Sequence, residues 1–526
     1  MKEFPRETYK ALDEEIEGIL KRKVWQGAHW RYLSKAERAA VLRSSAFVRN
    51  KLDQFNNILK WKARIVTDGS MQDRTKYSEE EISSPTVKLS SIFTLATIAA
   101  ALGLEIQTSD VAQAFLNSEM PNTVHVILNE IVSNVLCQRD PTFNQFKDIK
   151  GRVLVKLLKG QYGCIESAKL WYNTISNFLT KCGYEKNKFD ECVFQKFGDN
   201  GNRIYVAIYV DDIFTVATDK KMIDELNQLL EKEFGEMKKN RSKVHEYLGM
   251  SFDFSEASKV KINMKKFLNE VISESNITSI AETPAAENLF NISDNSPLLN
   301  DTDREKFHST VAKLLYAGVR VRPDILLPII FLSSRVTKAT TEDAKKLRRV
   351  LRYLNGTVDM GITLRPDTDG ALRIHTYADA SYGVHGDCKS HTGIMISLGG
   401  GPVLCKSVKQ KIVTKSSTEA ELVALSDATS LASYQLNFME SLGFNFEPVI
   451  MHQDNQSTIN LANNGISNSD RTKHIKIRYF FIKQFIDSGE FVIEYCPTEV
   501  MLADLLTKPI QGRKFIELRN KLLGSY

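Results

Sequence analysis

The run "RIYVAIYVDDIFTVAT" (residues 203–218) constrains the fold more than any other stretch of the chain. Its β-branched, aromatic and aliphatic residues are typical of buried strands, yet Asp211 and Asp212 stand in the middle. Adjacent carboxylates repel each other and are costly to bury without a counter-charge. The pattern therefore predicts a hairpin with both aspartates at its tip. A plain turn is the alternative, although the Gly or Asn that tight turns favour is missing.

Asp110 ends another predicted strand, in the segment "EIQTSDVAQAFLNSEM". Three carboxylates that converge on one spot suit divalent cations, whose charge offsets the repulsion. Mg²⁺ prefers carboxylate oxygens and substrate phosphates, and two such ions can hold the attacking and leaving oxygens of a phosphoryl transfer. We therefore predict a magnesium site made by Asp110, Asp211 and Asp212.

A second acidic set lies in residues 371–526, where the pattern predicts the order β-β-β-α-β-α-β-α of a separate α/β domain. Asp379, Asp454 and Asp504 each lie beside an apolar strand end or in an apolar helix face. These are unusual places for structural carboxylates. The set is therefore a second candidate functional site.

Glu419 and Glu421 compete for a fourth place in this set. Two residues apart on a helix, they point about 200° away from each other. The face of Glu421 continues with alanines and leucines, and the face of Glu419 with serines and an asparagine. We therefore expect Glu421 to point inward, and Glu419 to point toward water in a capping box with Ser416.

The composition indicates a globular, intracellular protein of about three or four domains. The 526 residues are 42% hydrophobic, and no apolar run reaches the roughly 20 residues of a membrane helix. The charged start "MKEFPRETYKALDEEIEGIL" is unlike a secretory signal. Seven scattered cysteines without a CxxC pair indicate reduced thiols and no zinc site.

Local patterns place further elements along the chain. A charged helix is expected up to about residue 45, a hairpin over 46–70, and a strand at "EYLGMSFDF". Three more helices are expected at about 303–318, 323–336 and 341–354. The net charge is +6, and the basic residues gather in "KSVKQKIVTK" (406–415) and "RTKHIKIRYFFIK" (471–483). Such clusters suit a phosphate backbone, and a solvated helix face is the alternative.

The motifs, taken in order, resemble a known family. "YVDD" is similar to the signature of reverse transcriptases, and "TSDVAQAFLNSEM", "LLKGQYGCIESAKLWY" and "WKARIVTDG" are similar to blocks of its copia-type members. From about residue 10 to residue 526 the chain resembles the reverse transcriptase–ribonuclease H region of a copia-type (Pseudoviridae) LTR retrotransposon Pol polyprotein. It departs from the family's "GLKQAP" with "GCIESA" and from "RMSS" with "KLSS". Both departures leave the acidic residues untouched.

The resemblance implies an α/β and α+β multidomain fold. A right-hand polymerase with fingers, palm and thumb would be followed by a helical connection and a C-terminal ribonuclease H-like domain. The expected regions are an N-terminal helical segment at 1–45, fingers and palm at 46–254, a mostly helical thumb and connection at 255–370, and the ribonuclease H-like domain at 371–526.

The resemblance also implies how a nucleotide would be held. Phe115 would crowd the sugar 2′ carbon and exclude a 2′-hydroxyl, which favours DNA synthesis; a core phenylalanine is the alternative. Lys62 and Arg64 would meet the triphosphate, or they lie on a solvated strand face.

Tyr162 and Gly163 would pack on the incoming nucleotide, with Gly163 allowing close backbone approach. Lys238 would protonate the pyrophosphate, although Lys239 is equally well placed in the sequence. "EYLGM" (246–250) would lie near the primer end.

The second acidic set resembles the D-E-D-D carboxylates of ribonuclease H. Each acidic site would bind two Mg²⁺ ions, for which Mn²⁺ can substitute. The histidine that many relatives carry before the last aspartate is absent from "CPTEVML". His474 would contact the nucleic-acid backbone, with a surface histidine as the alternative. The expected backbone contacts are Lys406, Lys409, Lys411, Lys415, Arg471, Lys473 and His474.

The implied activity is RNA- and DNA-directed DNA synthesis coupled to cleavage of RNA in the RNA–DNA hybrid. Its partners would be an RNA template, a DNA primer and template, the hybrid and dNTPs, with no membrane. Synthesis would take place in cytoplasmic virus-like particles, with a nuclear phase. An inactive or host-co-opted nucleic-acid-binding remnant is the alternative, and a ribonuclease with a silent polymerase domain is a third reading. The sequence leaves the oligomeric state open.

Overall fold

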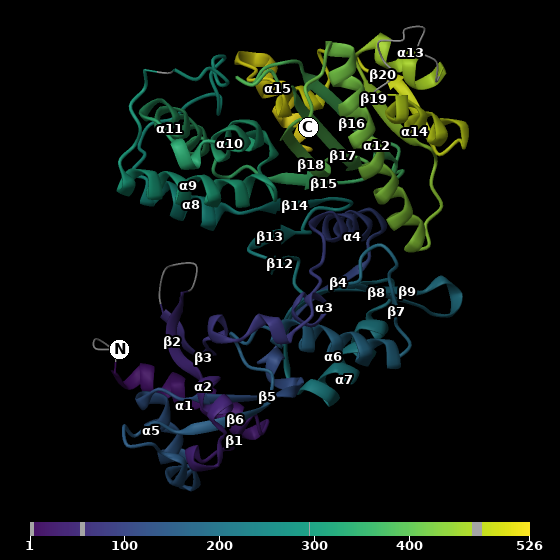
Figure 1. Ribbon diagram of the computed structural model, residues 1–526. Coiled ribbons are helices and arrows are strands. Elements are labelled where there is room, and N and C mark those ends of the chain that lie inside the picture. Colours follow the sequence, from purple (N-terminus) through teal and green to yellow (C-terminus); the bar gives the residue numbers. More distant parts are fainter. Residues whose placement is uncertain (1–4, 53–57, 294, 465–475, 526) are drawn as a thin grey trace.

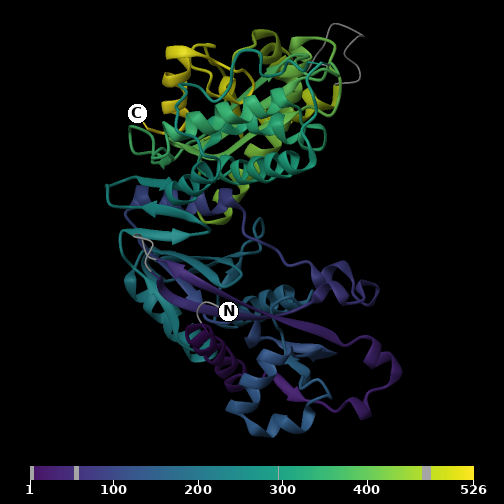
Figure 2. The ribbon, with the colours of Figure 1, turned by 90° about the vertical axis from the view of Figure 1, so that its left-hand side faces the viewer.

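The computed structural model describes residues 5–52, 58–293, 295–464 and 476–525. Its helices and strands form two tiers (Figure 1). One holds most elements from α1 (Pro5–Lys21) to β11 (Met237–Asn240), and the other most elements from α8 (Lys265–Glu274) to α15 (Gly512–Leu522). A small sheet and helix α4 lie between the tiers, and Figure 2 shows the same arrangement from the side. Among the described helices, none combines the length and apolarity needed to cross a membrane.

The first sheet, of order β1-β6-β5-β2-β3, forms the end of the lower tier. Its strands are β1 (Trp25–Gly27), β2 (Leu42–Leu52), β3 (Ile58–Thr67), β5 (Glu119–Ile127) and β6 (Leu154–Lys159). Strands β2 and β3 form the hairpin expected over 46–70, and its turn lies outside the described residues. Helix α1 (Pro5–Lys21) packs on β3 and on helix α5 (Glu130–Arg139).

The expectation of a helical segment over residues 1–45 is only partly confirmed. Helix α1 forms because Leu12, Ile16 and Ile19 recur at helical spacing and are buried as one stripe. After it, β1 pairs with β6, a short helix α2 (Lys35–Ala39) follows, and β2 begins at Leu42. The segment is therefore built into the first sheet, and the boundary at residue 45 falls inside a strand.

The second sheet, of order β11-β4-β10-β9-β8-β7, carries the paired aspartates. Its strands are β4 (Glu105–Val111), β7 (Glu185–Lys186), β8 (Val193–Phe197), β9 (Arg203–Tyr209), β10 (Asp212–Ala217) and β11 (Met237–Asn240). Helix α4 (Leu89–Leu102) covers one face, and α6 (Ser167–Lys181) with α7 (Lys220–Phe234) covers the other. Because both faces are buried, β9 needs apolar residues at nearly every position.

The third sheet, of order β12-β13-β14-β15, joins the tiers. Its strands are β12 (Val244–Tyr247), β13 (Met250–Asp253), β14 (Val260–Asn263) and β15 (Ile362–Leu364). "EYLGMSFDF" is therefore a hairpin and not the single strand expected, because Leu248 and Gly249 take positive φ of 52° and 76° and form a two-residue turn. The sheet also crosses the expected boundary at residue 254.

Helices dominate the region between β14 and β15. They are α8 (Lys265–Glu274), α9 (Asp301–Gly318), α10 (Leu326–Ser333) and α11 (Thr341–Asn355). The helices expected at about 303–318 and 341–354 are confirmed as α9 and α11. Of the helix expected at 323–336, only the middle part forms an α-helix, which is α10. A short 3-10 turn lies on either side of it, at Pro323–Ile325 and at Val336–Lys338.

The fourth sheet has the order β18-β17-β16-β19-β20, and its elements follow the predicted order except that two helices, not one, lie between β19 and β20. Its strands are β16 (Ile374–Ser381), β17 (His391–Leu398), β18 (Pro402–Lys409), β19 (Val449–Gln453) and β20 (Phe491–Tyr495). Its helices are α12 (Ser417–Ser441), α13 (Gln456–Asn464), α14 (Lys476–Asp487) and α15 (Gly512–Leu522).

The C-terminal unit is packed directly against the second sheet. The amide of Gln435 on α12 donates to the Thr94 hydroxyl (2.8 Å), and the Tyr205 hydroxyl donates to the Leu442 carbonyl (2.6 Å). One hydrophobic core runs from α4 through α9–α11 to the fourth sheet. The expected domain at 371–526 thus has its own sheet but shares its core with the rest of the chain.

Two candidate active sites

The first acidic site lies at one end of the second sheet. Strand β4 carries Asp110, and β10 begins at Asp212, which is the direct cross-strand partner of Asp110. Asp211 lies in the two-residue turn between β9 and β10. Cross-strand partners project from the same face of a sheet. The hairpin predicted from "YVDD" therefore brings its aspartates to Asp110, 101 residues earlier in the chain.

The turn between β9 and β10 is held in an unfavourable backbone conformation. Val210 has φ of 56°, a left-handed value that a β-branched residue rarely adopts. Two hydrogen bonds fix it: the buried Trp171 indole donates to the Val210 carbonyl (2.6 Å), and the Val111 amide donates to the Asp211 carbonyl (2.9 Å). Strain of this kind persists only where the surroundings enforce it. The tip of the predicted hairpin is thus held in one conformation, and its left-handed residue was not predicted from the sequence.

Burial raises the pKa of Asp211, and the charge of Asp110 raises it further. The cations Arg64 and Lys62 act in the opposite direction and lower that pKa. The aspartate at the tip is therefore less exposed than a simple hairpin turn implies, and its surroundings contain charges of both signs. A cation placed between Asp110 and Asp211 would offset both unfavourable contributions.

Lys62 and Arg64 lie on the exposed face of β3, where they alternate with the buried Ala63 and Ile65. Lys62 lines a cavity of about 450 Å³ together with Asp110, Asp211 and Lys238. The structure therefore brings cations of the first sheet to the carboxylates of the second.

The two candidate lysines of β11 are clearly separated. Lys238 is the cross-strand partner of Asp110 and lines the cavity with it. Lys239 is ion-paired with Glu231 of α7, at 2.6 Å. The geometry therefore favours Lys238, which the sequence could not distinguish from Lys239.

The aromatic residues expected around the nucleotide also meet. Phe115 lies in the 3-10 helix η4 (Ala114–Asn117), and its ring centroid is 5.1 Å from that of Tyr162 in an edge-to-face arrangement. The Arg64 guanidinium lies 5.3 Å from the Tyr162 ring centroid. Gly163 is needed within the fold itself: with φ of 92°, its α-carbon approaches Thr67, and an added Cβ would lie 2.0 Å from the Thr67 carbonyl oxygen.

The second acidic site lies where β16, β19 and η10 (Leu502–Leu506) meet. Asp379 and Asp504 are almost completely buried, and Asp454 is partly buried. One oxygen of each carboxylate lies within 4.8 Å of one oxygen of each of the others. The Thr498 hydroxyl donates to Asp454 (3.0 Å), and the Thr507 hydroxyl donates to Asp379. Three ligand oxygens at this spacing fit a divalent cation.

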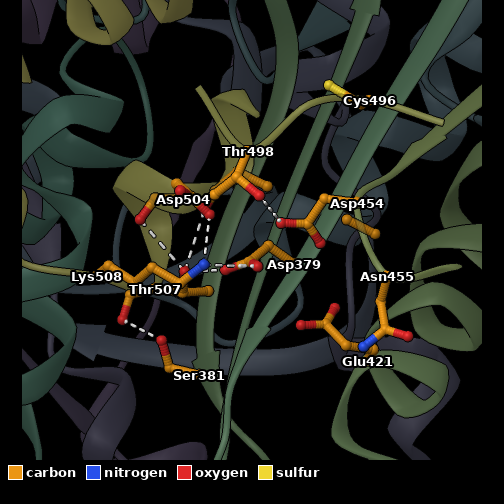
Figure 3. A network of polar contacts seen from close by, with 12 residues as sticks. Asp379, Ser381, Glu421, Asp454, Asn455, Cys496, Thr498, Asp504, Thr507 and Lys508 are labelled. Carbon is orange, nitrogen blue, oxygen red and sulfur yellow. Dashed lines mark hydrogen bonds and ion pairs between the residues drawn. The ribbon is translucent and has the colours of Figure 1, made fainter. Parts of the chain in front are cut away.

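Lys508 already supplies a positive charge to this site. Its ammonium lies between two carboxylates (Figure 3), 3.0 Å from Asp379 and 2.6 Å from Asp504. Burial opposes the charge on Lys508, but Asp379 and Asp504 outweigh it and raise its pKa. Sequence reasoning missed this residue, although its spacing of four from Asp504 was visible.

Glu421 points inward toward Asp379 and Asp454, as the helix geometry predicted. The residue is 6% exposed, and burial followed by the charges of Asp379 and Asp454 raises its pKa well above the usual range. Burial and Asp379 likewise raise the pKa of Asp504 to about 6. These shifts mark a site that favours bound cations or protons.

The expectation for Glu419 is wrong in one respect. Glu419 is only 5% exposed, because its carboxylate turns back and accepts a hydrogen bond from the Lys415 backbone amide (2.5 Å). The Ser416 hydroxyl accepts from the Glu419 amide, as expected for a helix cap. Glu419 therefore closes the start of α12 and does not point toward water.

The expected basic contacts are only partly described. Lys406 lies on β18, and Lys411 and Lys415 lie in the loop after it, all exposed. Lys409 forms an ion pair with Asp387 at 2.8 Å. Arg471, Lys473 and His474 lie outside the described residues.

Comparisons with known proteins agree with the resemblance seen in the sequence. Residues 30–286 match the family model described as "Reverse transcriptase (RNA-dependent DNA polymerase)". Over 98% of its length the chain is 29% identical to the "Retrovirus-related Pol polyprotein from transposon TNT 1-94" of Nicotiana tabacum, of which it covers 38%. The chain is thus similar to retrotransposon Pol polyproteins, as its motifs indicated.

Two more Pol polyproteins extend this relationship. Identity is 28% over 90% of the chain with that of transposon RE1 of Arabidopsis thaliana, and 23% over 97% with the Ty1-JR1 Gag-Pol polyprotein of Saccharomyces cerevisiae. The chain covers 31% and 28% of these relatives, so it spans well under half of their length. Among solved structures, a foamy viral protease-reverse transcriptase in complex with ds DNA has a TM-score of 0.48 at 14% identity, over 93% of this chain and 69% of that chain.

Proposed function

We propose that the chain is an RNA- and DNA-directed DNA polymerase that also cleaves RNA in the RNA–DNA hybrid. The observation that carries the proposal is the cross-strand pairing of Asp110 with Asp212 beside the turn residue Asp211, next to a cavity lined by Lys62 and Lys238. Carboxylates and cations at one spot match the needs of a nucleoside triphosphate and its metal ions.

In this proposal each chain segment has a defined task. The first sheet forms the fingers, the second sheet the palm, and the helices between β14 and β15 the thumb and connection. Asp110, Asp211 and Asp212 would hold two Mg²⁺ ions, which when bound would stabilise the charge that develops on the reacting phosphate. Their donor set fits, since all three are carboxylates at one end of a sheet.

The surrounding residues would orient the nucleotide. Lys62 and Arg64 on β3 would neutralise the triphosphate, and Lys238 would hold a proton for the departing pyrophosphate. Phe115, which contacts Tyr162, would form the wall against which a ribose 2′-hydroxyl clashes.

The second acidic site would cleave the RNA strand. Asp379, Asp454 and Asp504 provide oxygens at a spacing that suits a divalent ion, and Glu421 faces them from α12. The exposed lysines after β18 would contact the hybrid, whose backbone proteins recognise mainly by shape. The two sites together suit an enzyme that copies RNA and removes it, acting in cytoplasmic virus-like particles with a nuclear phase.

The test is incorporation of labelled dTTP on a poly(rA)/oligo(dT) template with Mg²⁺, alongside cleavage of labelled RNA in a hybrid and as a free strand. We expect incorporation that depends on the primer, and cleavage of the hybrid only. Folded protein that binds the hybrid but performs neither reaction would instead support a nucleic-acid-binding remnant. All seven candidate carboxylates are present in the sequence, which argues against a decayed copy.

A further inference from the structure

Helix α1 makes polar contacts with the segment that carries Phe115. Gln113 precedes η4 and has φ of 54°, a left-handed value. Its side chain reaches α1, where the Gln113 amide donates to the Glu15 carboxylate (2.9 Å). A residue that adopts this backbone conformation needs support from its surroundings. Glu15 is 9% exposed and supplies part of that support.

Arg22, one residue past α1, contacts the same segment at three points. Its guanidinium donates to the Gln113 side-chain oxygen (2.7 Å), to the Ala112 carbonyl (3.4 Å) and to the Asn117 side-chain oxygen (3.3 Å). These residues lie before and after Phe115, so one planar donor group spans the whole turn. Phe115 itself contacts the Tyr162 ring.

Gly18 leaves the space that this arrangement requires. A Cβ added to Gly18 would lie 2.3 Å from the Gln113 side-chain oxygen. The docking of α1 has a separate basis, since Leu12, Ile16 and Ile19 are each at most 1% exposed in the core of the first sheet. The polar contacts can therefore be removed while the apolar face keeps the helix in place.

We propose that Arg22, Gln113 and Glu15 are positioning residues that hold Phe115 against the sugar of the incoming nucleotide and so control discrimination between dNTPs and rNTPs. This inference rests on the proposed polymerase function. Helix α1 and Arg22 lie before residue 30, outside the span matched by the reverse transcriptase family model. No sequence pattern indicates this role, because Arg22 and Glu15 are two charges among many in this segment.

The test compares kcat/KM for dTTP and rUTP on a poly(rA)/oligo(dT) template. We expect Arg22→Ala to lower the ratio of kcat/KM for dTTP to kcat/KM for rUTP about tenfold, because small displacements of a positioning group change rates by such factors. The effect should fall mainly on this ratio and less on the overall rate of synthesis. Gln113→Ala and Gly18→Ala should act in the same direction, and Arg22→Lys should restore part of the preference. Lys21→Ala is the matched control: it removes an exposed neighbouring charge and should leave the preference unchanged.

The double variant Arg22→Ala/Phe115→Val separates positioning from a general structural effect. If Arg22 acts through Phe115, the double variant should discriminate no worse than Phe115→Val alone. RNA cleavage by the second site of the same chain should stay unchanged and serves as the folding control. Equal losses for dTTP and rUTP, or an unchanged preference in an active Arg22→Ala chain, would overturn the inference alone. Absence of all incorporation by the unaltered chain would overturn the proposed polymerase function.

Discussion

The two acidic sites gather carboxylates in different ways. At the first site, Asp110 and Asp212 pair across neighbouring strands, and the nearby cations come from two sheets, with Lys62 on β3 and Lys238 on β11. At the second, Lys508 lies four residues after Asp504 and contacts two carboxylates directly. The first site therefore adjoins a cavity that a charged ligand can enter, whereas the second site already contains a counter-charge, the ammonium of Lys508.

This difference suggests different demands on folding. Repulsion at the second site is already offset within one short segment of chain, so Asp379 and Asp504 can be almost fully buried. At the first site, the Val210 turn adds backbone strain to this cost, and two hydrogen bonds hold the turn in place. Each of the following predictions alters one of the two sites or the unit that carries it.

The largest expected effect separates the two reactions. Asp211→Asn should lower DNA synthesis about 1,000-fold or more, because removing one group that stabilises transition-state charge has effects of this order. RNA cleavage should stay within about twofold of the unaltered chain, and Asp379→Asn should show the reverse pattern. Incorporation and hybrid-cleavage rates on the same preparations give the answer. Loss of both activities in either variant would contradict two independent sites.

Removing the counter-charge should destabilise the protein through the second site alone. Lys508→Met leaves Asp379 and Asp504 buried without their shared partner, which costs several kcal/mol for a fully buried pair. The lysine is 38% exposed, so we expect a smaller loss of about 2 kcal/mol in the free energy of unfolding, after discounting for solvent screening. Urea denaturation at pH 7 measures it. Lys411→Met, at an exposed lysine, should change stability by under about 0.5 kcal/mol.

Acid should weaken the unit that carries the second site. His385 and His391 are buried in a chain of contacts that runs to Ser407, whose hydroxyl donates to the Leu506 carbonyl. Burial, then the charge of Lys409, lowers the pKa of His385 to about 4, and burial, then His385, lowers that of His391 to about 3. Because the folded pKa values lie below the unfolded value, this stability is complete above about pH 6.5 and is lost as the pH falls toward 4.

Each histidine should contribute up to about 2 kcal/mol of this loss between pH 6.5 and pH 5. Urea denaturation across this range, on the unaltered chain and on His391→Asn, isolates the effect from other titrating groups. The variant should be less stable at pH 7 and should show a shallower decline with acid. Parallel curves would show that His391 is not the group responsible.

The sequence anticipated local features better than contacts between distant segments. The hairpin at 203–218 and the order of the C-terminal elements follow from alternation and turn residues, which act over a few positions. The break of "EYLGMSFDF" into a hairpin was missed because Leu248, not a typical turn residue, takes a left-handed conformation beside Gly249. Glu419 was misplaced because helical periodicity carries no information about the Lys415 amide that its carboxylate reaches.

The candidate sites show the same contrast between local features, which the sequence predicts, and contacts between distant segments, which it does not. The acidic residues stood out in the sequence because they interrupt apolar strands, and the structure brings each set together. The polar contacts of Trp171, Arg22 and Gln113 could not be read from the sequence, since they join segments 39 to 98 positions apart. Packing between distant elements, which no local pattern encodes, determines how the sites are held.

The smallest expected effect concerns the strained turn of the first site. Val210→Gly relieves the left-handed strain but adds backbone freedom to the unfolded chain, two effects of about 1 kcal/mol and opposite sign. The free energy of unfolding should therefore change by less than about 1 kcal/mol. The rate of DNA synthesis should fall although the free energy of unfolding changes little, because the tip that carries Asp211 gains freedom. The rate of RNA cleavage should stay unchanged. A variant that synthesises DNA at the unaltered rate would show that the Trp171 and Val111 hydrogen bonds position the aspartates without help from the valine.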